Sequence, residues 1–241
     1  MKAGLVIADF TGVYEEEGFL PELRSRDVPF RLVRLGDVEG TNCYCDPEAE
    51  AEILRRMTPV VERVRWIDSG DYHYVSKILA GLETEPFTLV LLDNHPDDQA
   101  PAFGGVLSCG SWVREMKERN PMLEAVWTLG PDYRIRGGQV DRELEDGIGD
   151  LLEELKGRRV YLSVDKDVLD RAHARTDWSQ GTYSLEQLKG WLGHILDEAD
   201  VVAVDLCGEL SPGKGATPED LRVNCETNIE LQEFILEHLK K

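Results

Sequence analysis

The sequence predicts a three-layer α/β/α protein, in which helices cover both faces of a mostly parallel, doubly wound central sheet. Apolar, β-rich runs alternate with amphipathic segments along the 241 residues, and this alternation is typical of parallel strands joined by crossover helices. Several apolar runs are almost continuously hydrophobic, as strands are when both of their faces are buried. No linker rich in Pro, Gly or Ser divides the chain, so we expect a single domain over residues 1–241.

The expected strands and helices follow from these runs. Strands are expected at residues 4–10, 30–36, 64–68, 87–93, 124–130, 158–165 and 200–206, and helices at 47–64, 111–120, 141–157, 184–199 and 217–241. Pro59 should kink or split the first helix, because proline cannot donate the helical hydrogen bond. Ser184 and Gln187 have the spacing of a capping box. Thr217 before Pro218 is typical of an N-cap followed by a first-turn proline.

The composition favours a reduced, cytoplasmic protein. The net charge is −20, which argues against binding to nucleic acid or to anionic membranes, since both need basic surface on the protein. Asp9 interrupts the first apolar run too early for a signal peptide, and no apolar run approaches the length of a membrane span. The cysteines form no CxxC pair that would indicate a zinc knuckle or a thioredoxin-like site; they are Cys43, Cys45, Cys109, Cys207 and Cys225. The sequence leaves open whether the protein is a monomer or a homo-oligomer.

The stretch TLVLLDNHPDD, residues 88–98, gives the first indication of function. Asp93, His95 and Asp97 follow an apolar run at positions i, i+2 and i+4, and in an extended segment such positions point to one side. Pro96 prevents a helix here and biases His95 toward extended conformations. Ligands of parallel sheets bind beyond the carboxyl ends of the strands. The pattern therefore predicts a set of three metal ligands, with an ordinary acidic loop as the alternative.

Two further strand ends carry residues of the same kind. Asp165 and Asp167 stand where the run RRVYLSVD ends, and His73 follows the run VRWID and a turn at residues 69–70. Four carboxylates in one crevice would be costly without cations, because unpaired buried carboxylates are destabilising. Carboxylates together with imidazole suit a pair of divalent ions. The expected ligands are His73, Asp93, His95, Asp97, Asp165 and Asp167.

These motifs resemble those of the ureohydrolase superfamily, which includes arginase, agmatinase and formimidoylglutamase. The family reads GGDHS, then DAHxD, then SxDxDxxDP. The chain has SGDYH at 69–73, DNHPD at 93–97 and SVDKDVLD at 163–170, in the same order. A further family element, a Glu followed by x, Asn or Ser, and Pro, is similar to GELSP at 208–212.

The resemblance implies an arginase-like fold that binds two divalent metal ions, expected to be Mn²⁺. It implies a hydrolase in which a metal-bridging hydroxide attacks a C–N bond of a linear guanidino, amidino or formimino compound. Asp97 would carry the proton to the leaving amine. Glu209, taken to have no cationic partner in the protein, would hold the small cationic guanidino or formimino substrate by charge-assisted hydrogen bonds. Trp178 and Gln180 lie in a loop expected to cross the active end of the sheet and line the substrate pocket, although Trp178 could instead pack against the next helix.

Three departures from the family pattern leave a second function open. GDYH has one residue more than GGDH before His73, and Arg171 replaces the Pro after SxDxDxxD. The stretch GGVLSCGSW at 104–112 has Ser108 and Cys109, but no histidine where the family has one in its substrate pocket. A non-catalytic metal-binding or regulatory protein on the arginase fold is therefore the alternative to an enzyme. The GNH of two-metal phosphoesterases and glycine-rich nucleotide-binding loops do not occur in the chain.

Overall fold

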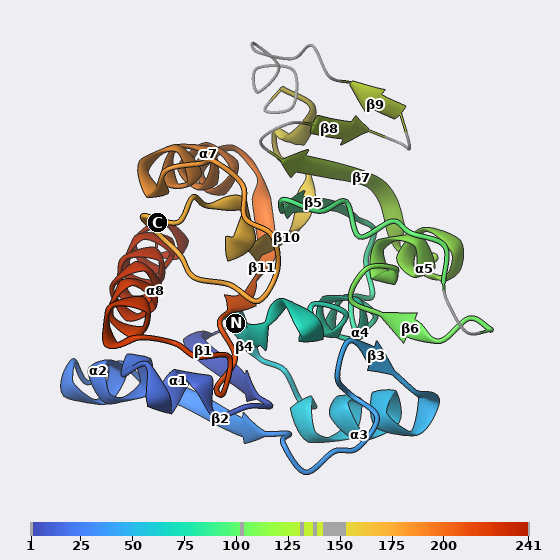
Figure 1. Ribbon diagram of the computed structural model, residues 1–241. Helices are drawn as coiled ribbons and strands as arrows, with labels where there is room; N and C mark the ends of the chain where they lie inside the picture. Colours follow the sequence, from blue (N-terminus) through green and yellow to red (C-terminus); the bar gives the residue numbers. More distant parts are fainter. Residues whose placement is uncertain (1, 102–103, 131–132, 137–138, 142–152, 241) are drawn as a thin grey trace.

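The computed structural model describes residues 2–101, 104–130, 133–136, 139–141 and 153–240 (Figure 1). Its main strands are β1 (Lys2–Asp9), β2 (Phe30–Arg34), β4 (Glu62–Ser69), β5 (Phe87–Leu92), β7 (Leu123–Gly130), β10 (Arg159–Asp165) and β11 (Asp200–Glu209). These strands lie side by side in the order β2-β1-β4-β11-β10-β5-β7, and each neighbouring pair runs parallel. The predicted mostly parallel α/β sheet is therefore confirmed, and all seven predicted strands are present within a few residues of their expected ends.

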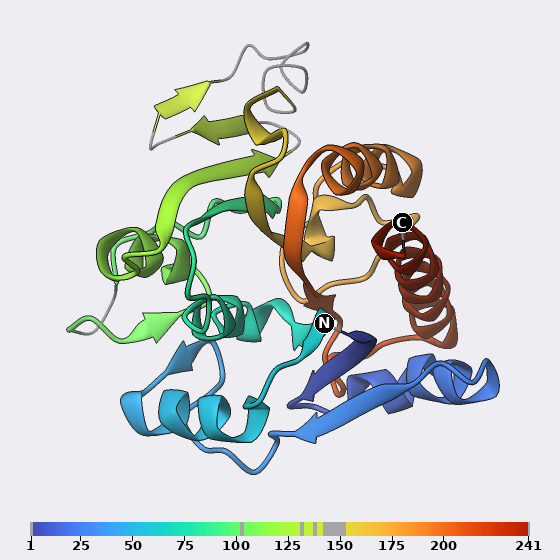
Figure 2. The same ribbon diagram turned by 180° about the vertical axis from the view of Figure 1, so that it is seen from behind.

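Four short strands extend this arrangement. At one edge, β8 (Tyr133–Arg136) pairs antiparallel with β7, and β9 (Gln139–Asp141) pairs antiparallel with β8. Away from the main sheet, β3 (Tyr44–Cys45) and β6 (Leu107–Ser108) form a separate antiparallel pair. Figures 1 and 2 show this small pair beside the lower helices, apart from the long sheet.

Helices cover both faces of the sheet, as expected (Figures 1 and 2). One face carries α1 (Val13–Glu16), α2 (Phe19–Ser25), α7 (Leu185–Glu198) and α8 (Pro218–Leu239), which share one buried apolar cluster with the strands. The other face carries α3 (Pro47–Met57), α4 (Val75–Ala80) and α5 (Trp112–Arg119), which share a second cluster. Side chains alternate between the two clusters along each strand; in β1, Leu5 and Ile7 belong to the first, and Val6 and Ala8 to the second.

The helix predictions met different outcomes. The capping box of Ser184 and the N-cap at Thr217 are confirmed, because each hydroxyl accepts a hydrogen bond from a backbone N–H three residues later. The helix expected at 47–64 is wrong beyond Met57, and β4 begins soon afterwards. Pro59 holds the preceding Thr58 in an extended conformation, with ψ of 140°, which a helix cannot accommodate.

The helix expected at 141–157 lies mostly outside the described residues. Among the helices that are described, none is both long and apolar enough to cross a membrane.

The topology brings four strand ends together. The strands β4, β11, β10 and β5 are consecutive in the sheet and parallel, so their carboxyl ends lie at one edge. The short 3-10 turns η1 (Gly70–Tyr72) and η2 (Lys166–Val168) follow β4 and β10 directly at that edge. This edge is where a parallel sheet presents a ligand site, and it carries every motif that resembled the ureohydrolases.

Candidate metal centre

All six predicted ligand residues meet at this edge. His73 follows η1, and its Nδ1 lies 3.1 Å from Asp97 Oδ2, 3.3 Å from Asp93 Oδ2 and 3.6 Å from Asp165 Oδ2. The imidazole of His73 and the three carboxylates are nearly or fully buried. The extra residue in GDYH is therefore accommodated by the 3-10 turn, and His73 still reaches the carboxylates that follow β5 and β10.

A second cluster lies beside the first and shares Asp93 with it. His95 Nδ1 lies 2.7 Å from Asp167 Oδ2 and 3.7 Å from Asp93 Oδ1. Asp93 thus presents one carboxylate oxygen to each imidazole. Two groups of ligand atoms joined by a common carboxylate form the kind of arrangement that can hold two metal ions.

The two histidine rings use their nitrogen atoms in the same way. The Nε2 of His73 bonds to the Ser163 hydroxyl at 2.9 Å, and the Nε2 of His95 bonds to the Ser179 hydroxyl at 2.9 Å. Each imidazole therefore has its Nε2 held by a hydroxyl and its Nδ1 directed at carboxylates. Metal-binding histidines in proteins commonly have the second nitrogen held in this way, because that contact fixes the ring and its tautomer.

The loop after β5 reaches this geometry differently from the expectation. Residues 93–97 form a bent loop rather than an extended segment, and Asp97 has a positive φ of 46°. Aspartate is among the residues that tolerate this left-handed region. The bend directs Asp97 toward His73, whereas His95 turns toward Asp167. The expectation of a straight comb of three ligands is therefore wrong, and the three side chains divide between two clusters.

The loop after β10 is shaped by its own carboxylate. Asp165 Oδ1 accepts a hydrogen bond from the Asp167 backbone N–H at 2.8 Å, which closes η2. Gly208 on the neighbouring strand has a φ of 97°, and a Cβ there would lie 2.8 Å from the Lys166 backbone nitrogen and would collide with Asp165. Glycine at 208 therefore allows β11 to approach the ligand loop closely. Cys207, just before it, lies 3.3 Å from Asp165 Oδ2 through its Sγ.

The electrostatics of the cluster favour a bound cation. Burial raises the pKa of Asp165 to about 6 and that of Asp167 to about 7, and burial also raises the pKa values of Asp93 and Asp97. The hydrogen bond to Asp167 raises the pKa of His95 to about 11. Burial disfavours the charged form of each aspartate, and the neighbouring carboxylates add to this effect, so a cation beside them would lower the energy of the ionised site.

The residues present fit a pair of divalent ions. The Nδ1 of His73 is buried and makes no hydrogen bond of good geometry, although three carboxylate oxygens surround it. A nitrogen placed in this way is satisfied by a metal ion. Two divalent cations would also balance the charge of the four aspartates while leaving both imidazoles neutral. Oxygen and imidazole donors suit Mn²⁺ among other divalent ions.

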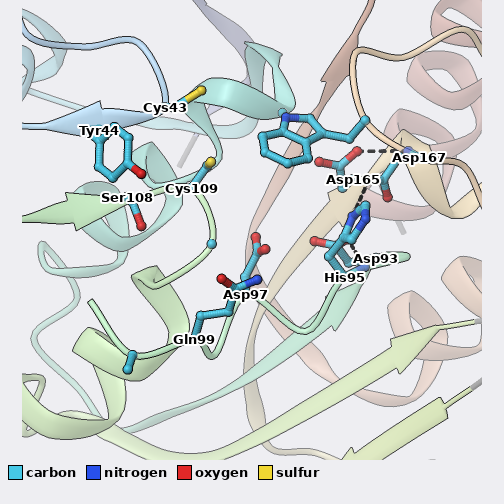
Figure 3. Close-up of a pocket in the computed structure, with 14 residues that line it drawn as sticks. Cys43, Tyr44, Asp93, His95, Asp97, Gln99, Ser108, Cys109, Asp165 and Asp167 are labelled. Atoms are coloured by element: carbon cyan, nitrogen blue, oxygen red, sulfur yellow. Dashed lines mark hydrogen bonds and ion pairs between the residues drawn. The ribbon is translucent and has the colours of Figure 1, made fainter. Parts of the chain in front are cut away.

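A cavity of about 260 Å³ opens above the clusters. Asp93, Asp97, Asp165, Asp167 and His95 form one part of its lining. Figure 3 shows the opposite part, where Cys43 and Tyr44 come from the β3 segment, and Ser108 and Cys109 from the β6 segment. Gln99, Ala100, Gly110, Gly70 and Trp178 complete the lining.

The two predicted pocket residues of the loop after β10 have different positions. Trp178 borders the cavity, its Nε1 donates to Asp71 Oδ1 at 2.9 Å, and its ring meets His95 edge-on at a centroid distance of 6.0 Å. Gln180 is not among the cavity residues. Its amide donates to the backbone carbonyls of Leu169 and Ala174 at 3.2 and 3.0 Å, so the expectation that Gln180 lines the pocket is wrong.

Glu209 also differs from the expectation. It is fully buried at the end of β11, outside the cavity lining, and its carboxylate is paired with the ammonium group of Lys166. Asn228 and Asn224 donate further hydrogen bonds to the same carboxylate at 2.9 and 3.2 Å. The expectation that Glu209 has no cationic partner in the protein is therefore wrong. Lys166 supplies the charge that had been assigned to a substrate.

Several residues at the site were missed by the sequence analysis. Trp112 donates to Asp97 Oδ2 at 2.6 Å, and Cys207 approaches Asp165. Lys166 offered a usable signal, since a lysine between two predicted metal ligands on a buried strand end requires an anionic partner. Tyr44 and Cys43 offered none, because their segment reaches the cavity only through the pairing of β3 with β6.

Comparisons with known proteins give a consistent assignment of the fold. No family model matches the chain. An uncharacterized protein from Thermotoga maritima is 31% identical over 211 residues, which cover 86% of this chain and 80% of that protein. Proclavaminate amidino hydrolase from Streptomyces clavuligerus superposes with a TM-score of 0.69 at 20% identity, covering 98% of this chain and 93% of its own. Arginase from Bacillus caldovelox superposes with a TM-score of 0.65 at 16% identity, covering 98% of each chain.

Proposed function

The chain belongs to the same family as the Thermotoga maritima protein and has the arginase fold; from this premise we propose that it is a dinuclear-metal hydrolase. It would cleave a C–N bond in a small cationic guanidino, amidino or formimino compound. The observation that carries the proposal is the pair of His–Asp clusters joined by Asp93 and facing a cavity. Two divalent ions held there, expected to be Mn²⁺, would lower the pKa of a bound water molecule enough to supply hydroxide near neutral pH.

The residues of the chain have separate roles in this proposal. His73, Asp93, Asp97 and Asp165 would hold one ion, and His95 and Asp167 would complete the site of the second with Asp93. The serine hydroxyls bonded to the imidazole Nε2 atoms would keep Nδ1 directed inward.

Asp97 is the proposed carrier of the proton to the leaving amine. It lines the cavity, and burial raises the pKa of its carboxyl group, which favours uptake of a proton by this group. Trp112 donates to one of its oxygens at 2.6 Å and would hold the carboxyl plane in place. Glu209 has no part in this proposal, because Lys166 already neutralises it.

The test combines metal content with product release. Protein loaded with Mn²⁺ should contain about two ions per chain by elemental analysis, and should release urea or ammonia from members of a guanidino, amidino and formimino panel. Asp165→Asn should lose metal and activity together. Asp197→Asn is the matched control, since Asp197 is about half exposed on α7 and does not belong to the cavity lining. Unchanged metal content in Asp165→Asn would refute the site.

A non-catalytic metal-binding or regulatory protein is the second candidate. The observation in its favour is the pairing of Glu209 with Lys166, which withdraws a carboxylate that the resemblance assigned to substrate. Two bound ions per chain with no hydrolysis across the panel would support this candidate over the enzyme.

A further inference from the structure

The wall of the cavity carries no fixed charge in the described residues. Beyond the four aspartates and His95, the lining consists of Cys43, Tyr44, Gly70, Gln99, Ala100, Ser108, Cys109, Gly110 and Trp178. Both thiols are neutral, because burial raises the pKa of Cys43 to about 11 and that of Cys109 still further. A substrate extending away from the aspartates would therefore meet thiol, hydroxyl, amide and aromatic groups only.

The other charged groups near the cavity lie outside its lining. Two divalent ions would balance the four aspartates, so these would have no excess charge for a second cationic group. Glu209 is paired with Lys166. Asp71 accepts a hydrogen bond from Trp178. Asp71 also raises the pKa of the Cys43 thiol, whereas Lys214 lowers it. Neither Asp71 nor Lys214 belongs to the lining.

Two exposed aromatic side chains border the cavity. Among the described residues, the exposed large hydrophobic side chains are Tyr44, Val61, Leu82 and Trp178, and the first and last of these line this cavity. Exposed apolar groups that gather at one concave site commonly mark a binding surface. Trp178 packs closely over Gly70, where a Cβ would lie 2.9 Å from its Cδ1, and its Nε1 donates a hydrogen bond to Asp71. Gln99 and Ser108 add polar groups that suit a neutral hydrogen-bonding partner.

Resting on the proposed hydrolase function, we infer that the substrate is a guanidino or related compound whose non-reacting part is uncharged and partly apolar. That part would lie against Tyr44 and Trp178, within reach of Gln99 and Ser108. A charged tail, such as the ammonium of agmatine or the amino-acid group of arginine, would lose water on entering and would gain no counter-ion from the wall. An alkyl or aryl tail would gain from removing the two aromatic surfaces from water.

A set of matched guanidines tests this inference on the Mn²⁺-loaded protein. The compounds are butylguanidine and phenethylguanidine, with neutral tails, agmatine, with an ammonium, and guanidinobutyrate, with a carboxylate. Dissociation constants by calorimetry and kcat/KM for urea release are measured for each. We expect both neutral compounds to bind at least about tenfold more tightly than both charged ones.

Tyr44→Ala should weaken the binding of phenethylguanidine by about fivefold and leave the binding of agmatine unchanged. Leu82→Ala, at an exposed apolar residue outside the cavity lining, is the control and should change neither.

The outcomes separate this inference from the proposed function. Equal or tighter binding of agmatine or guanidinobutyrate, with hydrolysis, would overturn the neutral tail and leave the hydrolase standing. Selective binding of the neutral compounds without urea release would support the neutral pocket and count against catalysis. Absence of binding by all four compounds would overturn the inference, and absence of hydrolysis in the same experiment would count against the function independently.

Discussion

Breaking the buried pair of Lys166 and Glu209 should destabilise the protein strongly. Both side chains are completely buried. Lys166→Met removes the ammonium and keeps a side chain of similar volume, whereas Glu209→Gln removes the carboxylate charge and keeps its shape. Each single variant leaves one charged group of the pair without its ionic partner in the interior of the protein. The double variant leaves neither charge.

The hydrogen bonds around the pair set the expected magnitude. Removing one partner of a buried ion pair costs about 3–5 kcal/mol of unfolding free energy. In Lys166→Met, Glu209 keeps the amide donors of Asn228 and Asn224 at 2.9 and 3.2 Å, so we expect a loss near the lower end, about 3 kcal/mol. In Glu209→Gln, Lys166 keeps the Asn228 carbonyl oxygen at 2.5 Å as its remaining short contact. A second buried carboxylate, Glu17, accepts a hydrogen bond from the same Asn228 amide at 2.6 Å, and its pKa is raised by burial and by Glu209 but lowered by Lys166. Without Glu209, Glu17 can ionise and take over part of the pairing with Lys166, so we expect a loss of about 3 kcal/mol here as well.

Chemical denaturation of the metal-free proteins measures these losses. The double variant should be more stable than the sum of the single losses predicts, by at least about 1.5 kcal/mol of coupling. Lys156→Met is the matched control, because Lys156 forms an exposed pair with Glu198 at 3.9 Å and such pairs contribute about 0–1 kcal/mol. Single losses no larger than the control, or strictly additive losses, would show that the pair is not an interior ion pair. Retained activity in the double variant would further show that Glu209 does not hold substrate.

Two more predictions concern the metal and the cavity. The raised pKa values of Asp165 and Asp167, about 6 and 7, mean that these groups stabilise the metal-free fold below about pH 4 and lose that contribution as the pH rises through 6 to 7. Protons and metal compete for the same oxygens, so the rise in melting temperature on adding Mn²⁺ should grow from about pH 5 to about pH 8; a constant or shrinking rise would contradict this assignment. Trp178→Ala should raise KM for a hydrolysed guanidine, whereas Trp178→Phe, which keeps a ring beside His95 but loses the bond to Asp71, should raise it less. Unchanged kinetics in Trp178→Ala with a lowered melting temperature would assign Trp178 to packing alone.

The sheet and its active edge could be predicted from local patterns. A buried parallel strand is marked by a continuous apolar run, and the polar residues that end it necessarily lie at the carboxyl edge. Asp93, His95, Asp97 and Asp165 were placed correctly at that edge for this reason. The interruption expected at Pro59 is confirmed, since α3 ends at Met57, but the apolar residues after the proline belong to a strand and not to a second helical segment.

What the sequence determined by itself was the set of ligand-type side chains and the edge at which they meet, because both follow from where each apolar run ends. What only the tertiary structure decided was their partners. Glu209 contacts Lys166 because β11 lies beside β10, with Asp165 paired to Cys207. The order of strands in a sheet cannot be predicted from the apolar pattern of any one strand. The neutral wall of the cavity likewise exists because Tyr44 pairs with Ser108 across two short strands far apart in the chain. A side chain's neighbours through space set its charge balance and its access to the cavity, so these were fixed only when the chain had folded.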